Sequence, residues 1–442
     1  MNINGPLSEY FIAAGAPVIL QTCVISILFM FNWLCAHQIN KSMTRFTFAS
    51  LFIYLDMLYL VPFFISQTNG LAGFASAHGV SAYGFNLKMF SLYIVQLTII
   101  PLVLLSFYSR LGQRLYEAHF RSKFLFYIFT MILACYVLAY LITVKPGIYH
   151  AIVGDFQKAK DMRVAAVLGN TSEVSGVSRF FDFKNLFVWL LQAVLLSYLL
   201  GSKKWLNTCL LFALFILLAF INFSKGALVG SILMLIWAGS YKSKYLSYYP
   251  LIFLFVVTIA VLVSYTFFFH VNGIKLESAF AAIFRRIYNN SSSVYLQLNL
   301  FESLVPNFLY IQDWGKVGDL IGVDPMIPKE MVYQEFYSGE GQGGSTFISE
   351  MYFAFGWGGV ILVPFTLLPI VIIDKLLHCF RTSHNQASNW VSGMLLFWGT
   401  IFTLGIQASP FKIFNIFTIL RIEYFAIIVL VLLMIKVKVI KK

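Results

Sequence analysis

The chain has 442 residues, of which 60% are hydrophobic and only 11% are charged, and its formal net charge is +13. Soluble globular domains are nearer half apolar and a quarter charged, so this composition excludes a soluble protein. The positive charge does not indicate nucleic-acid binding, because a basic surface for that purpose needs a soluble domain to carry it.

Apolar stretches long enough to cross a hydrocarbon layer of about 30 Å recur along the whole chain. In chain order they occupy residues 11–35, 46–66, 90–107, 124–144, 185–200, 205–221, 226–240, 248–269, 347–374, 390–408 and 422–436. The first stretch is too long for a signal-peptide core and follows no basic segment, so we expect it to be retained as a helix. The sequence predicts an all-α integral membrane protein, with residues 1–442 forming one polytopic domain of about eleven transmembrane helices.

The distribution of basic residues predicts the orientation of these helices. With the N-terminus outside, sixteen lysines and arginines fall in cytoplasmic connections and four fall in the short outer connections. Short cytoplasmic loops are enriched in Lys and Arg, so this charge bias favours the N-terminus outside and the C-terminus inside. Two long loops, 145–184 and 270–346, then lie on the outer side, and neither contains any of the five cysteines. No disulfide framework is therefore predicted.

Asp56 is an acidic residue near the middle of the second apolar stretch. An unpaired charge at that depth costs about 2.5 to 3.5 kcal/mol, so we expect Asp56 to be partnered or protonated. A proton-coupled transporter would use such a residue. The alternative is a buried, hydrogen-bonded polar group with no chemical role.

Basic residues of the outer loops and turns are candidates for binding phosphate. Arg163 lies in the first long loop, Arg285 and Arg286 form a pair in the second, and Lys225 lies in a predicted outer turn beside a helix start. Guanidinium groups pair bidentately with phosphate oxygens, and a helix N-terminus with a lysine beside it forms an anion site. The alternative is that these side chains pair with loop acids or extend to lipid headgroups.

Glu350 follows a glycine-rich segment, 339–344, near the predicted outer end of a helix. At that place the carboxylate would remain hydrated and act as a base; the alternative is an interfacial helix cap or a partner of a loop cation. The sequence lacks a Walker-type phosphate loop, an Asp-x-Asp pair and a His-Glu-x-x-His helix. These absences argue against an ATP-driven pump and against an enzyme that takes nucleotide sugars from the cytoplasm.

Three of these segments resemble the O-antigen polymerase (Wzy-type) family, which is related to the O-antigen ligases. They are Phe-Ser-Lys-Gly-Ala-Leu at 223–228, Ile-Phe-Arg-Arg-Ile-Tyr at 283–288, and Gly-Ser-Thr-Phe-Ile-Ser-Glu-Met-Tyr-Phe-Ala-Phe-Gly-Trp-Gly-Gly at 344–359. The resemblance implies a GT-C-like membrane fold in the bacterial inner membrane, with its active face toward the periplasm. The predicted topology, with two long outer loops, agrees with this family.

The resemblance implies a metal-independent glycosyltransferase that needs no cofactor. Its substrates would be undecaprenyl-pyrophosphate-linked oligosaccharides, which it would polymerise into O-antigen or capsular polysaccharide, the former as part of lipopolysaccharide biosynthesis. Arg163, Lys225, Arg285 and Arg286 would bind the pyrophosphate, and Glu350 or His270 would deprotonate the attacking sugar hydroxyl. Expected partners are membrane lipids, a chain-length regulator and a repeat-unit flippase, with no nucleic acid.

Other functions remain open at this point. An O-antigen ligase would show His-Asn ten residues before glycine, whereas Ser345 and Thr346 precede Gly356 here. Some polymerase loops show arginine, ten residues and then glycine, but Val174 stands at that position after Arg163. A flippase or other transporter would explain Asp56 but not the long loops. A peptidoglycan polymerase of the shape-and-division type shares the lipid donor but not the motifs.

Overall fold

The computed structural model describes residues 16–43, 46–68, 87–109, 115–155, 157–158, 161–162, 184–201, 205–221, 230–236, 346–380, 385–408 and 422–439. The helices are α2 (Ala16–Met43), α3 (Phe48–Thr68), α5 (Leu87–Ser109), α6 (Lys123–Val144), α7 (Gly147–Val153), α10 (Lys184–Gly201), α11 (Trp205–Phe220), α17 (Phe347–Phe355), α18 (Val363–Cys379), α19 (Gln386–Ala408) and α21 (Ile422–Met434). A 3-10 helix, η4 (Gly356–Leu362), joins α17 to α18, and the strands are β1 (Tyr116–Phe120) and β2 (Ile435–Val439).

Long apolar helices make up most of the described chain. Five helical stretches in it are long and apolar enough to cross a membrane: Thr22–Met43, Phe90–Tyr108, Lys123–Val144, Phe347–Cys379 and Gln386–Ile406. Shorter apolar helices cover Phe48–Met57, Leu186–Gly201 and Leu206–Ala219. The prediction of a helical membrane protein is confirmed. The predicted helix at 248–269 and the long loop 270–345 lie outside the described residues.

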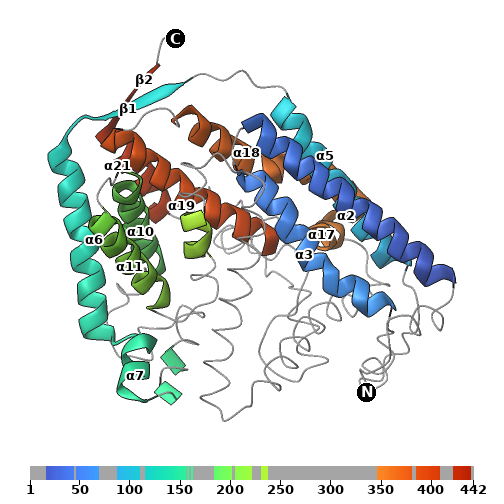
Figure 1. Cartoon of the computed structure of the whole chain (residues 1–442), viewed down its shortest axis with the longest axis horizontal. Coiled ribbons are helices and arrows are strands. Elements are labelled where there is room, and N and C mark those ends of the chain that lie inside the picture. Colours follow the sequence, from blue (N-terminus) through green and yellow to red (C-terminus); the bar gives the residue numbers. More distant parts are fainter. Residues whose placement is uncertain are drawn as a thin grey trace, which may run out of the picture.

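The helices form a row of packed layers (Figure 1). α6 stands at one edge beside α10 and α11, α19 and α18 fill the middle, and α2, α3 and α5 form the other edge. α2 has 28 residues, or about 42 Å at 1.5 Å per residue, which exceeds a hydrocarbon layer of about 30 Å. α2 and α3 are inclined relative to α6 in Figure 1.

The most extensive helix–helix packing joins α10 to α19. Its closest point is Gly393, where an added Cβ would meet the carbonyl oxygen of Ala193 at 2.4 Å. Lipid tails are as apolar as the helix side chains, so no hydrophobic effect drives membrane helices together. Small residues such as glycine let two helices approach closely and pack instead. Trp390, fully buried one turn earlier on α19, packs edge-on against Phe126 of α6 with ring centroids 5.3 Å apart.

A buried carboxylate ties three helices together at the end of the bundle that includes the start of α3. Asp374 of α18 accepts hydrogen bonds from the backbone N–H groups of Phe48 and Ala49, at 2.9 and 3.0 Å, and from the hydroxyl of Tyr108. The N–H groups of a first helical turn have no partner within their own helix. Asp374 therefore caps α3 from a neighbouring helix.

A two-stranded antiparallel sheet lies at this same end, beside the C-terminus (Figure 1). β2 begins one residue after α21 ends, so the apolar stretch predicted at 422–436 ends two residues early. β1 occupies the connection between α5 and α6, for which we predicted no strand. Ala118 donates its N–H to Ser388 Oγ at 2.9 Å, which fixes the sheet to the first turn of α19. The sequence did not predict these two short strands, although the described chain is predominantly helical, as expected for the all-α class.

The single helix predicted at 347–374 is instead interrupted. Gly356 has a φ of 60°, a left-handed conformation that glycine adopts without strain, and it ends α17 after nine residues. The chain then continues as the 3-10 helix η4 before α18 begins, where Pro364 stands in the first turn. The apolar pattern is continuous through this break, and therefore did not predict it.

The other predicted helices differ from the structure mainly in their ends. α2 extends to Met43, eight residues beyond the predicted end, whereas α3, α5, α6, α10 and α11 agree within three residues at each end. α19 begins four residues earlier than predicted. Of the stretch predicted at 226–240, residues 230–236 are described and are helical. A short helix, α7, lies at the start of the predicted outer loop 145–184.

Candidate functional site

The candidate site is the N-terminus of α17, which carries Glu350. Thr346 is the N-cap: its hydroxyl accepts the N–H of Ser349 at 3.2 Å, and Ser349 Oγ accepts the N–H of Thr346 at 2.8 Å. This reciprocal capping box satisfies two backbone donors and fixes the first turn. The capping box is formed by Thr346 and Ser349, and Glu350 is the next residue of this turn.

A side chain from another helix completes this end of α17. Gln96 of α5 accepts the N–H of Ile348 through its Oε1, at 3.1 Å. Its amide nitrogen, on the other side, donates to Oδ1 of Asp56 on α3. Gln96 therefore bridges three helices with one amide group, and it links Asp56 to the first turn of α17.

Asp56 is buried, with only 1% of its surface exposed. Gln96 is the partner that we expected such a residue to need. The second carboxylate oxygen, Oδ2, makes no hydrogen bond with any residue that the structure describes. A buried carboxylate at membrane depth that is only half satisfied marks a functional position by default.

Glu350 is also buried, with 7% of its surface exposed. The expectation that it stays hydrated at an outer helix end was wrong, because α17 begins inside the bundle rather than at its rim. Phe347 lies against Phe52 of α3, with ring centroids 5.7 Å apart, which places the start of α17 about one helical turn from Asp56. Asp56 and Gln96 thus form a buried polar cluster that contacts the first turn of α17, the turn that carries Glu350.

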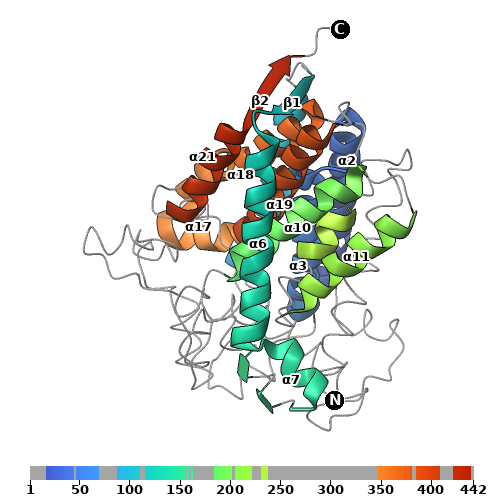
Figure 2. The ribbon, with the colours of Figure 1, turned by 90° about the vertical axis from the view of Figure 1, so that its left-hand side faces the viewer.

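α17 lies across the bundle rather than along it. It is seen nearly end-on in Figure 1, and in Figure 2 it crosses the view near the mid-height of α6. Short, interrupted helices at membrane depth are tolerated only where protein buries them or where they line a cavity. Discontinuous helices form the substrate sites of many transporters.

The remaining predicted site residues lie outside the described residues. They are Arg163, Lys225, His270, Arg285 and Arg286. Of the predicted set, only Glu350 is described. We did not assign Gln96, which bonds the first turn of its helix, or Asp56, which bonds Gln96, to the site. The described residues contain no group of three or more His, Cys, Asp or Glu side chains that could hold a metal ion.

Sequence reasoning missed Gln96, and a signal for it was present. Gln96 interrupts the third apolar stretch in its middle, as Asp56 interrupts the second. Polar residues in successive membrane spans often pair, since each is costly alone. Considering the two residues together would have predicted the contact, whereas their link to α17 required the structure.

Comparison of the chain with protein families, with curated proteins and with solved structures found no match. The chemistry of the site therefore rests on its own residues. Glu350 lies on the first turn of α17, and Gln96 accepts an N–H group of that turn.

Proposed function

We propose that this protein is a membrane-embedded, metal-independent glycosyltransferase that polymerises undecaprenyl-pyrophosphate-linked oligosaccharide repeat units. The observation that carries the proposal is Glu350, buried on the capped first turn of the interrupted helix α17. This helix lies in the segment 344–359, which is one of the three that resemble the O-antigen polymerases. In this family the product is O-antigen or capsular polysaccharide, made at the periplasmic face of the inner membrane.

The proposed reaction transfers a growing chain from its lipid carrier. A sugar hydroxyl of one lipid-linked repeat unit attacks the anomeric carbon of the chain, and the bond from that carbon to the pyrophosphate oxygen breaks. Glu350 takes the hydroxyl proton, with His270 as the other candidate base. Arg163, Lys225, Arg285 and Arg286 are proposed to stabilise the negative charge that grows on the departing pyrophosphate.

The proposed topology has about eleven spans, with the N-terminus outside and the C-terminus inside. Contacts among the described residues support it. The connection between α5 and α6 pairs with the segment after α21 through β1 and β2, and both were predicted to be cytoplasmic. Asp374, also predicted to be on the inner side, caps the start of α3. These segments share one end of the bundle, as the proposed alternation of spans requires.

A proton-coupled flippase or transporter is the second candidate, and one observation favours it. Asp56 is buried at membrane depth with Oδ2 unbonded among the described residues, as expected of a group that binds and releases a proton. In the polymerase, Asp56 only positions α17 through Gln96. An O-antigen ligase remains disfavoured because Ser345 and Thr346 replace its His-Asn pair.

Glu350→Gln in cells that display long-chain polysaccharide tests the proposal. The amide keeps the shape of the side chain but cannot take a proton, so we expect a rate loss of about 10²- to 10⁴-fold. Gel analysis of the surface polysaccharide should show single repeat units in place of a ladder, at an unchanged protein level. Arg286→Ala should give the same pattern, from a loss of about 10²- to 10³-fold.

Glu117→Gln is the matched control for Glu350→Gln. Glu117 lies in β1 and accepts a hydrogen bond from Asn385 at 2.7 Å, which glutamine can also accept. Its variant should retain the full ladder. A full ladder in Glu350→Gln would exclude Glu350 as the base, and a full ladder in Arg286→Ala as well would remove the proposed site altogether.

A further inference from the structure

The two-stranded sheet has one charged and one apolar face. Side chains alternate along a strand, so the register places Lys436 opposite His119 and Lys438 opposite Glu117 on one face. Both lysines are exposed, and neither forms an ion pair with any residue that the structure describes. Glu117 is instead held by Asn385, at 2.7 Å, and lies 3.5 Å from His119.

The apolar face of the sheet continues from the protein core to its exterior. At the inner end, Phe120 packs on Trp390 with ring centroids 5.9 Å apart, and Ile435 is buried. At the outer end, Val437 is 50% exposed and Val439 is 58% exposed. The two exposed valines, on the face opposite two lysines, make β2 amphipathic. On β1 the same face is covered by protein, because Ala118 is fully buried and Tyr116 packs on Phe380.

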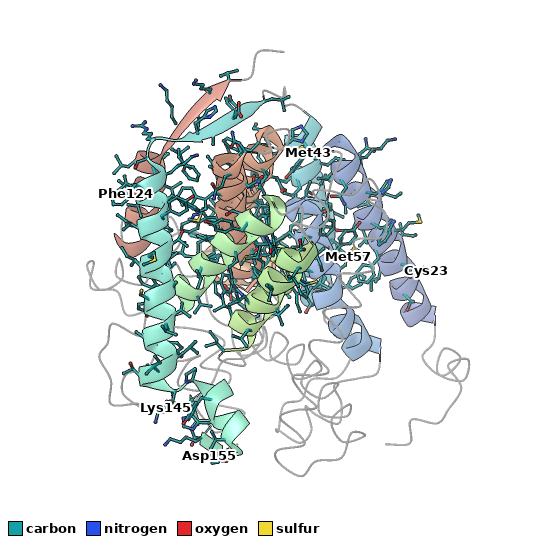
Figure 3. The ribbon with its side chains drawn as sticks, turned by 60° about the vertical axis from the view of Figure 1, so that its left-hand side comes forward. Cys23, Met43, Met57, Phe124, Lys145 and Asp155 are labelled. Carbon is teal, nitrogen blue, oxygen red and sulfur yellow. The ribbon has the colours of Figure 1, made fainter. Side chains whose placement is uncertain are left out.

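The helices that carry the sheet turn apolar side chains outward. Phe124, in the first turn of α6, is 71% exposed, and Figure 3 shows it on the outer side of that helix, at the end opposite Lys145. Leu432 and Leu433, in the last turn of α21, are 65% and 60% exposed. In a membrane protein such side chains contact hydrocarbon. Val437 is three residues beyond the last residue of α21, so about 10 Å of extended chain separates it from this surface.

Further basic side chains stand where the sheet meets these helices. Arg121 follows β1, and its Nε donates to the carbonyl of Ile435 at 3.1 Å, which fixes the guanidinium beside the start of β2. Arg121 and Lys123 are exposed. Four basic groups and two exposed valines therefore lie where α6 begins and α21 ends.

We propose that the sheet β1–β2 is a binding surface for the headgroups of anionic lipids in the bilayer. The valines face the acyl boundary, while Lys436 and Lys438, with Arg121 and Lys123, face the phosphates. The charge is complementary to an anionic leaflet, and the apolar side chains continue the lipid-facing surface of the helices. Such a contact would fix the ends of α6 and α21 to the membrane surface, independently of any catalytic activity.

The test is thermal unfolding of the full-length protein in nanodiscs with an increasing fraction of phosphatidylglycerol in phosphatidylcholine. For the parent protein we expect the melting temperature to rise with the anionic fraction, and this rise to shrink at high salt. Lys436→Gln/Lys438→Gln should need on the order of tenfold more phosphatidylglycerol for half of the rise. In pure phosphatidylcholine the double variant should have the same melting temperature as the parent protein, because neither lysine forms an ion pair with a described residue.

Two further variants keep the test specific. Lys436→Arg/Lys438→Arg preserves the charge and should retain the parent response. Lys41→Gln removes one exposed charge from the last turn of α2, which is not part of the sheet, and is the matched control for Lys438→Gln alone. An unchanged response in the double glutamine variant would overturn the proposal. An equal loss in Lys41→Gln and Lys438→Gln would also overturn it, because net charge and not the sheet would then set lipid binding.

Discussion

Two aspartates of this protein, Asp374 and Asp56, are both buried among apolar side chains, but they differ in the number of hydrogen bonds that they accept. Asp374 accepts two backbone N–H groups and a tyrosine hydroxyl, so both of its oxygens are bonded. Asp56 accepts one amide hydrogen bond, and its Oδ2 has none from the described residues. Burial of a carboxylate alone therefore does not indicate function. The two carboxylates differ in the number of donors that the fold supplies: three for Asp374 and one for Asp56.

The largest expected effect is on stability and follows from Asp374→Ala. It leaves three buried donors without their acceptor, and each costs about 1 to 3 kcal/mol. The yield of folded protein and its melting temperature in detergent should fall far more than for Asp56→Ala, which removes one hydrogen bond. Equal losses in the two variants would show that the distinction between the two carboxylates is wrong.

The next effect is on activity and comes from Gln96→Glu. The new carboxylate can still accept the N–H of Ile348, but it meets Asp56 with no donor between them. We expect the first turn of α17 to shift, and a displacement of about 1 Å can cost about 10²-fold in rate. The measurement is the length distribution of the polysaccharide, normalised to the amount of folded protein.

The double variant Asp56→Asn/Gln96→Glu sharpens this prediction. The amide and the carboxylate exchange places, so the new asparagine on α3 donates to the new glutamate on α5. That glutamate also accepts the N–H of Ile348, and the cluster keeps its charge. Activity should recover most of what Gln96→Glu lost. Without such recovery, Gln96 would not act by holding α17 through this chain of hydrogen bonds.

The smallest effect is expected for Asp56→Asn. Asparagine keeps the acceptor for Gln96, so the polymerase should retain activity within about threefold, with a normal level of folded protein. The measurement is the same polysaccharide ladder, with and without a collapsed proton gradient. A folded but inactive variant, in a protein whose activity needs the gradient, would favour the proton-coupled transporter instead.

The sequence predicted the helices well because each apolar span is a local signal, long enough to be recognised without its neighbours. It did not predict the break at Gly356, since the apolar pattern continues through it and only the backbone conformation changes. The sheet was missed because β1 and β2 are five residues each and lie more than 300 residues apart. Their pairing depends on where α5, α6 and α21 end.

The candidate site was predicted only in part, because its arrangement also depends on contacts between distant parts of the chain. Glu350 was selected from its segment, but its burial depends on α17 lying across the bundle, which no local pattern indicates. The link from Asp56 through Gln96 to Ile348 joins residues that are 40 and 252 positions apart. Such contacts follow from packing, and the sequence showed only that each polar side chain needed a partner.

The most direct test of the central claim uses purified protein reconstituted in liposomes with lipid-linked repeat units as the only substrate. The account predicts that the parent protein joins them into chains without added metal, in the presence of a chelator, and releases undecaprenyl pyrophosphate in proportion. It also predicts that Glu350→Gln, equally folded by its melting temperature, yields single units alone. Chains of normal length from Glu350→Gln, or no chains and no pyrophosphate release from the parent protein, would contradict it.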